Sequence, residues 1–385
     1  MMEQFVDKYI QHYGFAPTAA ACAPGRLEIL GNHTDYNQGL TLSCAVGNTT
    51  CCAMRPNGGT RCRVKDFRSG DEMIFDLSRP DDPPERNGSK YIKGVAVELM
   101  KLGAEIGGFD AAIESTVPLS AGMSSSAALE LSAALAMGVA FGIEMQPEEW
   151  ARLGQMVEND YLGLQTGLLD QFSSVFGRRD SMILSDFRSQ SVVRNVALPP
   201  GYSIVVINSM KKHNLVASDY NSRRRDCESA AAILAKYFEN LHTLRDISFD
   251  ELNAARSTLN WRQFRRALHV VGECARVEAG VKLLDEGDIM GFGRLWFESH
   301  ESSRLNFENS TPELDYLVSL AKSIPGCLGA RLSGGGFGGI TVHLVETAAA
   351  EEYAERVAAA YKKQTHIDPE RLVCSIGDGA TAFTL

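Results

Sequence analysis

The sequence predicts an α+β protein of two domains, and three observations lead to this expectation. The chain has 385 residues, whereas a single domain usually has roughly 100–200. Its first half mixes strand-like runs with a few helices, while residues 218–320 form a mostly helical and charged pattern. The turn-forming sequence Leu198-Pro199-Pro200-Gly201 favours a boundary within residues 188–202. We expect one domain over residues 1–190 and another over 191–385, and a return of the C-terminal strand to the first domain stays open.

Hydrophobic periodicity predicts the individual elements. One helix is expected to begin at Pro147, a favourable first helical residue, and to end at Gly163. Its apolar side chains fall on one helical face. The expected strands lie at 41–46, 73–75, 111–117, 203–208 and 340–345. The other expected helices lie at 90–102, 127–143 and 348–362.

Composition and charge exclude several classes of protein. An apolar fraction of 44% and a charged fraction of 22% are ordinary for globular proteins, so a disordered, collagenous or coiled-coil chain is excluded. The net charge of −10 argues against a nucleic-acid-binding protein. The longest near-apolar run, residues 131–143, is too short to cross ~30 Å of hydrocarbon, and charges at Glu3 and Asp7 argue against a secretory signal. We expect a cytoplasmic protein that needs no nucleic acid, membrane or obligate protein partner.

The nine cysteines are dispersed along the chain and form no CxxC pair and no zinc-like Cys/His cluster. Cysteines of this kind in an intracellular chain usually serve as small buried hydrophobic residues. We expect them to be free thiols without a redox or metal-binding role.

The 35 glycines are slightly more than average, and many of them gather in short clusters. Residues 117–128 (VPLSAGMSSSAA) join an expected strand to an expected helix. Such a loop can present backbone N–H groups and serine hydroxyls to a phosphate at the positive end of the helix. It is not a Walker A loop, because the chain contains no GxxxxGK[ST] sequence. A serine cap on a core helix is the alternative for this cluster alone.

Two further clusters point to a ligand. Residues 331–339 (RLSGGGFGG) hold five glycines within six residues, which is more than a bare turn needs. Residues 23–37 crowd polar side chains between apolar stretches, and these must be satisfied by one another or by a hydroxyl-rich ligand. The polar side chains of this second cluster are Arg26, Glu28, Asn32, His33 and Asp35.

A fourth cluster contains Glu158 and the sequence Gly167-Leu168-Leu169-Asp170-Gln171-Phe172. Asp170 lies in an apolar setting, which suits a general base unless a cation such as Arg26 keeps the carboxyl ionised. Taken singly, Asp170 is better explained as a helix cap or a surface charge.

In this order along one chain, the clusters resemble the galactokinase branch of the GHMP small-molecule kinases. The family's sugar signature GRxNLIGEHTDYNxG resembles GRLEILGNHTDYNQG at residues 25–39. Its phosphate motif PLGAGLSSSAALE resembles PLSAGMSSSAALE at 118–130, and its TGGGFGG resembles SGGGFGG at 333–339. Shorter likenesses extend the similarity over nearly the whole chain, at 90–95, 167–172 and 218–228.

The resemblance implies both a fold and an activity. The family has an N-terminal domain of the ribosomal protein S5 domain 2-like type and a C-terminal ferredoxin-like α+β domain, with the site in the cleft between them. Its activity is the transfer of a phosphoryl group from ATP, with Mg²⁺ as cofactor, to the anomeric hydroxyl of α-D-galactose.

The same resemblance implies roles for individual residues. Asp170 is expected to be the catalytic base, and Arg26 the cation that orients it and stabilises the transferring charge. The expected sugar contacts are Asn32, His33, Asp35, Gly167, Asp170 and Tyr220. The expected nucleotide contacts are Ser120, Ala121, Gly122, Met123, Ser124, Ser125, Ser126, Gly335 and Gly336. The expected Mg²⁺ ligands are Ser126 and Glu158.

Two positions of the sugar signature depart from the family. Glu28 stands where the family has asparagine, and Asn32 stands where it has the glutamate that contacts the sugar end bearing C6. A carboxylate would repel a C6 carboxylate, whereas an amide can donate to either a hydroxyl or an acid. Galactose is the expected acceptor, and a galacturonate-like, deoxy- or N-acetyl-sugar is the alternative.

Two other functions were weighed against a sugar kinase. Galactokinase-like sugar sensors lose part of the phosphate loop, but residues 124–128 are complete here, and Arg26, Glu158 and Asp170 are present. Kinases of mevalonate or homoserine share the phosphate loop but not the sugar segment at residues 26–37. Both alternatives are therefore less favoured.

Overall fold

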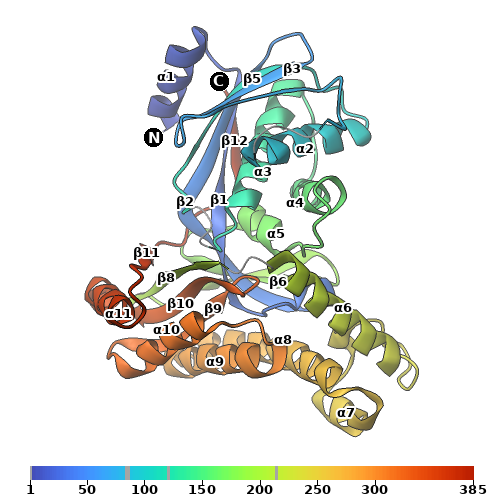
Figure 1. Ribbon diagram of the computed structural model, residues 1–385, viewed down its shortest axis with the longest axis vertical. Helices are drawn as coiled ribbons and strands as arrows, with labels where there is room; N and C mark the ends of the chain where they lie inside the picture. Colours follow the sequence, from blue (N-terminus) through green and yellow to red (C-terminus); the bar gives the residue numbers. More distant parts are fainter. Residues whose placement is uncertain (1, 83–86, 119–121, 213–215) are drawn as a thin grey trace.

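The computed structural model describes residues 2–82, 87–118, 122–212 and 216–385. Within these residues, an upper part is built on an eight-stranded sheet and a lower part on a four-stranded sheet (Figure 1). This arrangement confirms the predicted α+β class.

The larger sheet has the strand order β12-β1-β2-β5-β3-β4, and the β6–β7 hairpin extends it by pairing with β2. Among the described strands, β3 and β5 form the one parallel pair. The strands are β1 (Ala19–Leu30), β2 (Leu40–Pro56), β3 (Arg61–Asp66), β4 (Glu72–Asp76), β5 (Phe109–Ser115), β6 (Ser181–Asp186), β7 (Ser191–Ala197) and β12 (Thr381–Thr384).

Helices cover both faces of this sheet. The helix α1 (Met2–Tyr13) packs on one face through Phe5 and Tyr9. The other face is covered by apolar helices, and their side chains form a core with alternate residues of β1, β2 and β5. These helices are α2 (Asn87–Lys101), α3 (Ser125–Phe141), α4 (Pro147–Met156) with its continuation η2 (Val157–Tyr161), and α5 (Leu169–Phe176).

The smaller sheet has the order β11-β8-β10-β9, and all its pairs are antiparallel. Its strands are β8 (Tyr202–Lys212), β9 (Cys327–Ser333), β10 (Gly338–Glu346) and β11 (Glu370–Cys374). The helices that pack against it are α9 (Ile289–Ser302) with η5 (Ser303–Phe307), α10 (Pro312–Ser323) and α11 (Ala350–Thr365). The helix α8 (Trp261–Asp285) packs beside α9 and contacts β1 and β2 of the larger sheet. The helices α6 (Val216–Leu234) and α7 (Phe249–Ala254) extend to the side (Figure 1).

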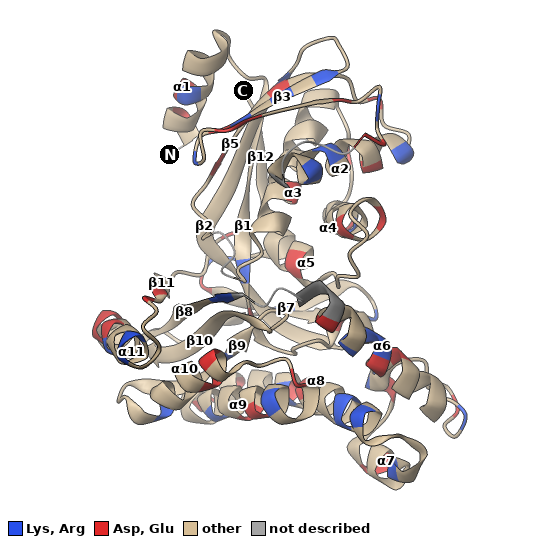
Figure 2. Ribbon diagram, in the orientation of Figure 1, with Lys and Arg blue, Asp and Glu red and all other residues tan. Residues whose placement is uncertain are grey.

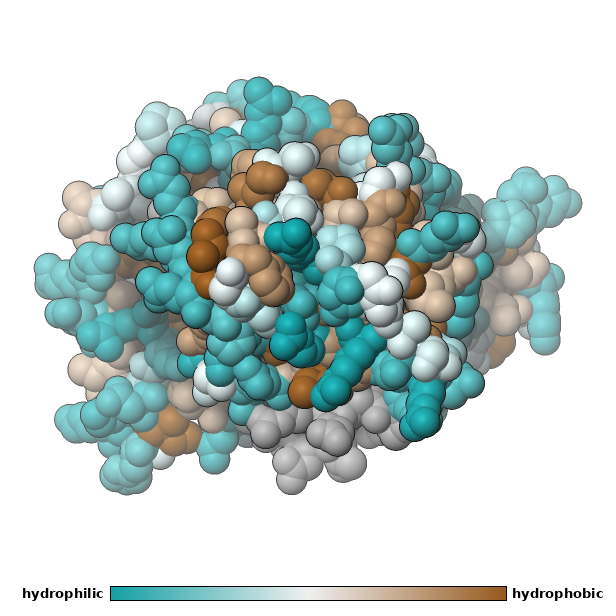
Figure 3. Space-filling view, turned by 90° about the horizontal axis from the view of Figure 1, so that it is seen from above, coloured by the Kyte–Doolittle hydropathy of each residue, from teal (hydrophilic) through white to brown (hydrophobic). Residues whose placement is uncertain are grey.

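In the lower part, charged residues are more frequent on the helices than on the strands of the sheet (Figure 2). In Figure 2 the strands β8, β9 and β10 are mostly uncharged, whereas Lys, Arg, Asp and Glu mark α6, α8, α9 and α11. Seen from above, the end of the upper part is covered mostly by hydrophilic side chains, and apolar ones lie in small groups between them (Figure 3). Among the described helices, none combines the length and apolarity that a membrane span requires.

The two parts share one hydrophobic core rather than meeting through a linker. Leu27 of β1 and Leu42 of β2 pack in the same cluster as Val206 of β8 and Val342 of β10, and Trp296 of α9 completes it. This shared core fixes the relative position of the two sheets, and the ends of β1, β9 and β10 meet beside it.

The predicted elements are present, and most of their ends differ by a few residues, but the strand expected at 41–46 is only the first part of β2, which continues to Pro56. The helix expected from Pro147 to Gly163 consists of α4 and the π-helical turn η2. The division at residue 190 differs from the strand pairing, because β7 pairs with β6 and β12 pairs with β1 in the larger sheet. The C-terminal strand therefore returns to the first part of the chain.

The expectation of free thiols was wrong for one pair of cysteines. Cys22 of β1 and Cys51 of β2 form a disulfide. The two residues are directly opposite each other in the antiparallel register of β1 and β2, so their side chains meet. The spacing of the cysteines along the chain gave no sign of this register.

Candidate active site

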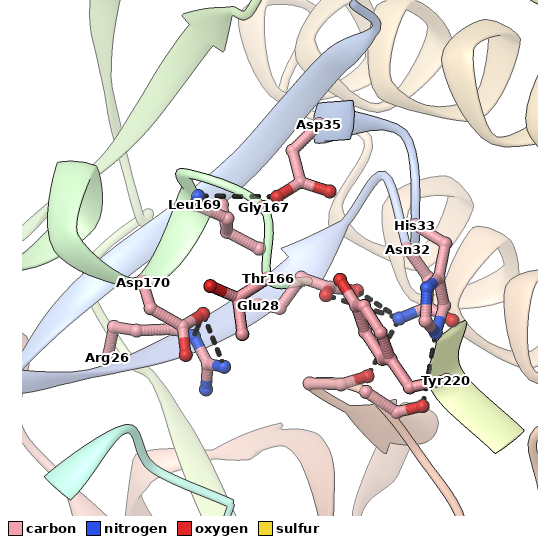
Figure 4. A pocket seen from close by; sticks show the side chains of 12 residues that line it. Arg26, Glu28, Asn32, His33, Asp35, Thr166, Gly167, Leu169, Asp170 and Tyr220 are labelled. Carbon is pink, nitrogen blue, oxygen red and sulfur yellow. Dashed lines mark hydrogen bonds and ion pairs between the residues drawn. The ribbon is translucent and has the colours of Figure 1, made fainter. Parts of the chain in front are cut away.

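A polar pocket lies where the two parts meet (Figure 4). Six segments contribute to it: β1, the loop that follows β1, the loop before α5, the first turn of α5, the helix α6 and the glycine-rich loop between β9 and β10. Its lining residues are Arg26, Glu28, Asn32, His33, Asp35, Thr166, Gly167, Leu169, Asp170, Tyr220, Gly334 and Gly335. All the residues that the sequence predicts as catalytic or sugar-binding are among them.

Arg26 and Asp170 form an ion pair at one side of the pocket. The Nε and Nη2 atoms of Arg26 donate to Oδ1 of Asp170 at 2.9 and 2.7 Å. The Nη1 atom donates to the backbone carbonyl of Gly122 at 2.6 Å, and Ser124 Oγ donates to the other oxygen of Asp170. Arg26 therefore links the carboxylate to the loop at the start of α3, and this charge-assisted pair is stronger than a neutral hydrogen bond.

The predicted phosphate loop is described from Gly122 onward, and Ser120 and Ala121 lie outside the described residues. Gly122 and Ser124 have left-handed backbone angles, and α3 begins at Ser125. Met123 is buried, whereas Gly122 is exposed. The first N–H groups of an α-helix have no intrahelical partner, so the start of α3 can bind an anion beside the Arg26–Asp170 pair.

Ser126 and Glu158 meet next to this helix start, since Ser126 Oγ donates to Glu158 Oε1 at 3.3 Å. Burial raises the pKa of Glu158, and the neighbouring Asp170 raises it further. Burial and Glu158 raise the pKa of Glu130 well above its ordinary value, and its Oε1 has no hydrogen-bond partner among the described residues. A carboxylate beside a serine hydroxyl at the start of a helix suits a divalent cation.

The protein alone does not form a complete metal site in the described residues, where no three His, Cys, Asp or Glu side chains converge. Ser126 and Glu158 supply two oxygen ligands, which fits a magnesium ion that takes its other ligands from phosphates and water.

Asp35 and Gly167 approach each other closely in the pocket. The backbone N–H of Leu169 donates to Asp35 Oδ2 at 3.3 Å. A Cβ atom on residue 167 would lie 1.6 Å from the same oxygen, so only glycine fits there. Burial raises the pKa of Asp35, while backbone N–H groups oppose the shift.

His33 connects the loop after β1 to the glycine-rich loop. Its Nδ1 is 2.9 Å from Tyr36 Oη and its Nε2 is 3.1 Å from the Gly335 carbonyl, so both ring nitrogens have protein partners. Burial lowers the pKa of His33 to about 3, and the ring is neutral at physiological pH. The ring of Tyr220 from α6 lies 5.0 Å from that of His33 and closes this side of the pocket.

Gly335 and Gly336, predicted as nucleotide contacts, lie on the sugar-signature side. Gly335 lines the pocket, and a Cβ there would be 3.3 Å from the Tyr220 ring. Gly336 packs against Asn309, whose carbonyl a Cβ would meet at 2.2 Å. Gly334, with a φ of 80°, lies nearer to Arg26 and Gly122.

The comparisons with known proteins agree on one family. The model of the GHMP kinases N terminal domain matches residues 90–178, that of the galactokinase galactose-binding signature matches 7–56, and that of the GHMP kinases C terminal matches 281–363. A galactokinase of Roseiflexus sp. is 40% identical, covering 97% of this chain and 95% of the relative. One of Actinobacillus pleuropneumoniae serotype 3 is 39% identical, covering 97% of each.

The chain belongs to the galactokinase family of the GHMP kinases. The structure of Lactococcus lactis galactokinase complexed with galactose superposes with a TM-score of 0.93 at 29% identity, covering 99% of both chains. The Methanococcus jannaschii mevalonate kinase has a TM-score of 0.63 at 18% identity over 93% of this chain, and it shares the fold alone. The predicted two-domain GHMP kinase fold is confirmed.

Several supporting residues were not predicted from the sequence. Glu273 of α8 accepts from the backbone N–H groups of Gly31 and Asn32, both at 3.0 Å, and His269 lies 3.0 Å from the Asn32 carbonyl. Burial alone would raise the pKa of Glu273, but Arg276, His269 and Arg331 hold it well below its ordinary value. The helical periodicity of α8 marks Glu273 as a buried acid, and nothing in the sequence indicates its partner.

Proposed function

We propose that the chain transfers the γ-phosphoryl group of ATP to the anomeric hydroxyl of α-D-galactose. The observation that carries this proposal is the Arg26–Asp170 pair, which joins a pocket lined by polar groups to the start of α3. In that position one carboxylate can reach a sugar hydroxyl while free helix N–H groups bind the phosphates.

Asp170 accepts the proton of the anomeric hydroxyl as the oxygen bonds to the γ-phosphorus. The bond between the γ-phosphorus and the bridging oxygen breaks, and ADP leaves. Arg26 holds Asp170 in place and stabilises the negative charge that develops on the transferring group. Ser126 and Glu158 would hold Mg²⁺, which when bound neutralises phosphate charge.

The charges of the pocket favour a neutral sugar. Glu28, Asp35 and Asp170 line it, and Arg26, the cation of the lining, is paired with Asp170. An acidic sugar would bring a further negative charge into this low-dielectric site, at a cost in binding. This supports galactose over galacturonate.

Because ATP is a cytoplasmic nucleotide, we place the reaction in the cytoplasm.

The test is a panel of acceptor sugars with ATP and Mg²⁺, in which ADP release is measured. Galactose is expected to give the highest kcat/KM, well above that of galacturonate or N-acetylgalactosamine. A preference for galacturonate, or binding of galactose without ADP release, would overturn the proposal.

A further inference from the structure

The side-chain amide of Asn32 has no capacity left for a ligand. Its Nδ2 donates to the Glu28 carboxylate at 2.9 Å and to the Gly334 carbonyl at 2.8 Å. Its Oδ1 accepts from Asn309 Nδ2 at 2.9 Å and from Ser303 Oγ at 3.4 Å. An amide has two N–H donors and two lone pairs on its oxygen, so the protein satisfies all four.

The carboxylate of Glu28, in contrast, keeps an acceptor free. Its Oε1 accepts from Arg331 Nη2 at 2.8 Å and from Asn32 Nδ2 at 2.9 Å. Within the described residues, Oε2 shares only the same Asn32 N–H, at 3.2 Å. Since each carboxylate oxygen has about two acceptor sites, Oε2 can accept a further hydrogen bond. Figure 4 shows Glu28 in the pocket between the Arg26–Asp170 pair and Asn32.

Arg331 of β9 fixes the orientation of this carboxylate. Its side chain is 0% exposed, its Nη1 donates to the Ile29 carbonyl at 2.7 Å, and its Nη2 pairs with Glu28. A buried guanidinium without a counter-charge is strongly destabilising, so Arg331 keeps Oε1 of Glu28, and Oε2 is the oxygen left for the pocket that Glu28 lines. Burial raises the pKa of Glu28, and Arg331 and Arg26 act against that shift.

We propose that Glu28 binds a hydroxyl of the sugar through Oε2, and that Asn32 is a positioning residue that orients Glu28. The proposal rests on the proposed function. The sugar contact expected for Asn32 is thereby assigned to Glu28 instead. The two departures from the family signature act together, because Asn32 donates a hydrogen bond to Glu28.

The test compares galactose with a set of monodeoxygalactoses in the wild type, Glu28→Gln and Asn32→Ala. In Glu28→Gln the amide oxygen must face Arg331 and Asn32, so the NH₂ group faces the pocket and can only donate to a hydroxyl, a neutral contact weaker than the one that the hydroxyl makes to a carboxylate. For one of the deoxy sugars, kcat/KM is expected to be lower than for galactose by about tenfold or more in the wild type. In Glu28→Gln the same difference between the two sugars is expected to be no more than about threefold. Because Arg331 still holds the carboxylate, Asn32→Ala is expected to reduce this discrimination only partly, to a ratio between those of the wild type and Glu28→Gln.

Two further variants keep the test decisive. Glu239→Gln removes a carboxylate from an exposed turn after α6, and its kcat/KM for each sugar is expected to equal that of the wild type. If Glu28→Gln does not fold, Glu28→Asp retains the charge for Arg331 but withdraws the carboxylate by one methylene, and it should lose the same sugar discrimination.

The outcomes separate the two proposals. A wild type that shows no galactose-dependent ADP release refutes the proposed function. An active wild type whose deoxy-sugar ratios are unchanged in Glu28→Gln and Glu28→Asp refutes the role of Glu28 alone. Loss of discrimination in Asn32→Ala but not in the Glu28 variants would assign the contact to Asn32 instead.

Discussion

At the residue scale, Arg26 has contacts on both sides of the reacting centre. It pairs with Asp170 through two nitrogens and binds the Gly122 carbonyl of the phosphate loop through the third. A planar guanidinium can hold these groups in one fixed geometry, which a lysine ammonium cannot. The proposed base and the predicted phosphate loop are therefore linked through Arg26 in the protein without substrate.

Replacing Asp170 by asparagine should abolish most turnover. The amide cannot accept the hydroxyl proton, so kcat is expected to fall by about 10²–10⁴-fold. ATP binding, measured by calorimetry, should stay within about threefold, because the start of α3 is unchanged. Asp7→Asn in the exposed face of α1 is the matched control. A near-wild-type kcat in Asp170→Asn would refute its role as the base.

Replacing Gly167 by alanine should damage sugar binding selectively. The new Cβ would lie 1.6 Å from Asp35 Oδ2, so the carboxylate or the loop must move. The KM for galactose is expected to rise about tenfold or more, as for the loss of a hydrogen bond to a charged group, while the KM for ATP changes little. Gly59→Ala, where the nearest atom is 3.4 Å from the Cβ, is the control. Equal KM changes for both substrates would contradict this role.

The sequence predicts the side chains that line the pocket better than those that support them. Arg26, Asn32, His33 and Asp35 lie within ten residues of one another, so a local motif identifies them. Arg331 contacts Glu28 across 303 residues of sequence. No local pattern encodes such a partner, because the pairing depends on how β9 docks beside β1.

At the scale of elements, helix α8 holds the loop after β1. Glu273 accepts two backbone N–H groups of this loop and the hydroxyl of Ser299, all through Oε2. The lower part of the molecule thereby orients the sugar segment of the upper part. Since Glu273 itself does not line the pocket, it acts through the backbone of Gly31 and Asn32.

Substituting Glu273 by glutamine is expected to raise the KM for galactose about tenfold and to leave the KM for ATP within about twofold. The amide retains an acceptor but removes the negative charge that Arg276 and the two N–H groups share. Steady-state kinetics with each substrate varied in turn provides the measurement. Glu278→Gln on the exposed side of α8 controls for the charge. If the KM for both substrates rises equally, α8 does not act on the sugar loop alone.

At the scale of the whole molecule, burial keeps several histidines neutral. It lowers the pKa of His343 to about 3, and Coulombic repulsion from His300 adds to this shift. It also lowers the pKa of His269 to about 4. His343 lies in β10, with its ring nitrogens 2.8 Å from Thr341 Oγ1 and 2.7 Å from Tyr353 Oη. Below pH 6.5 the unfolded chain binds protons that the folded chain does not, so stability is greatest above this pH and falls toward pH 3.

The variant His343→Gln should weaken this pH dependence. Between pH 6 and pH 4 the free energy of unfolding of the wild type is expected to fall more steeply than that of His343→Gln, by up to about 1.4 kcal/mol per pH unit. Denaturant titrations at several pH values measure the difference. His242→Gln, at an exposed position, should keep the wild-type slope. Parallel slopes in His343→Gln and the wild type would show that His343 is not held neutral.

The sequence also predicts the class of the fold better than it predicts which strands pair with each other. Alternation and helical periodicity reveal most strands and helices, because each follows from the faces of one element. The return of β12 to β1 and the disulfide between Cys22 and Cys51 depend on register between strands. Register is set by packing and turns across the whole sheet, and so it lies beyond a reading of single segments.

The most direct test of the central claim is an NMR spectrum of the product formed from ATP, Mg²⁺ and galactose labelled with ¹³C at C1. We expect a sugar phosphate in which the C1 signal is shifted and split by coupling to phosphorus. We also expect no product from methyl galactoside, whose anomeric hydroxyl is blocked. A phosphate on any other carbon, or no galactose-dependent product, would contradict the account.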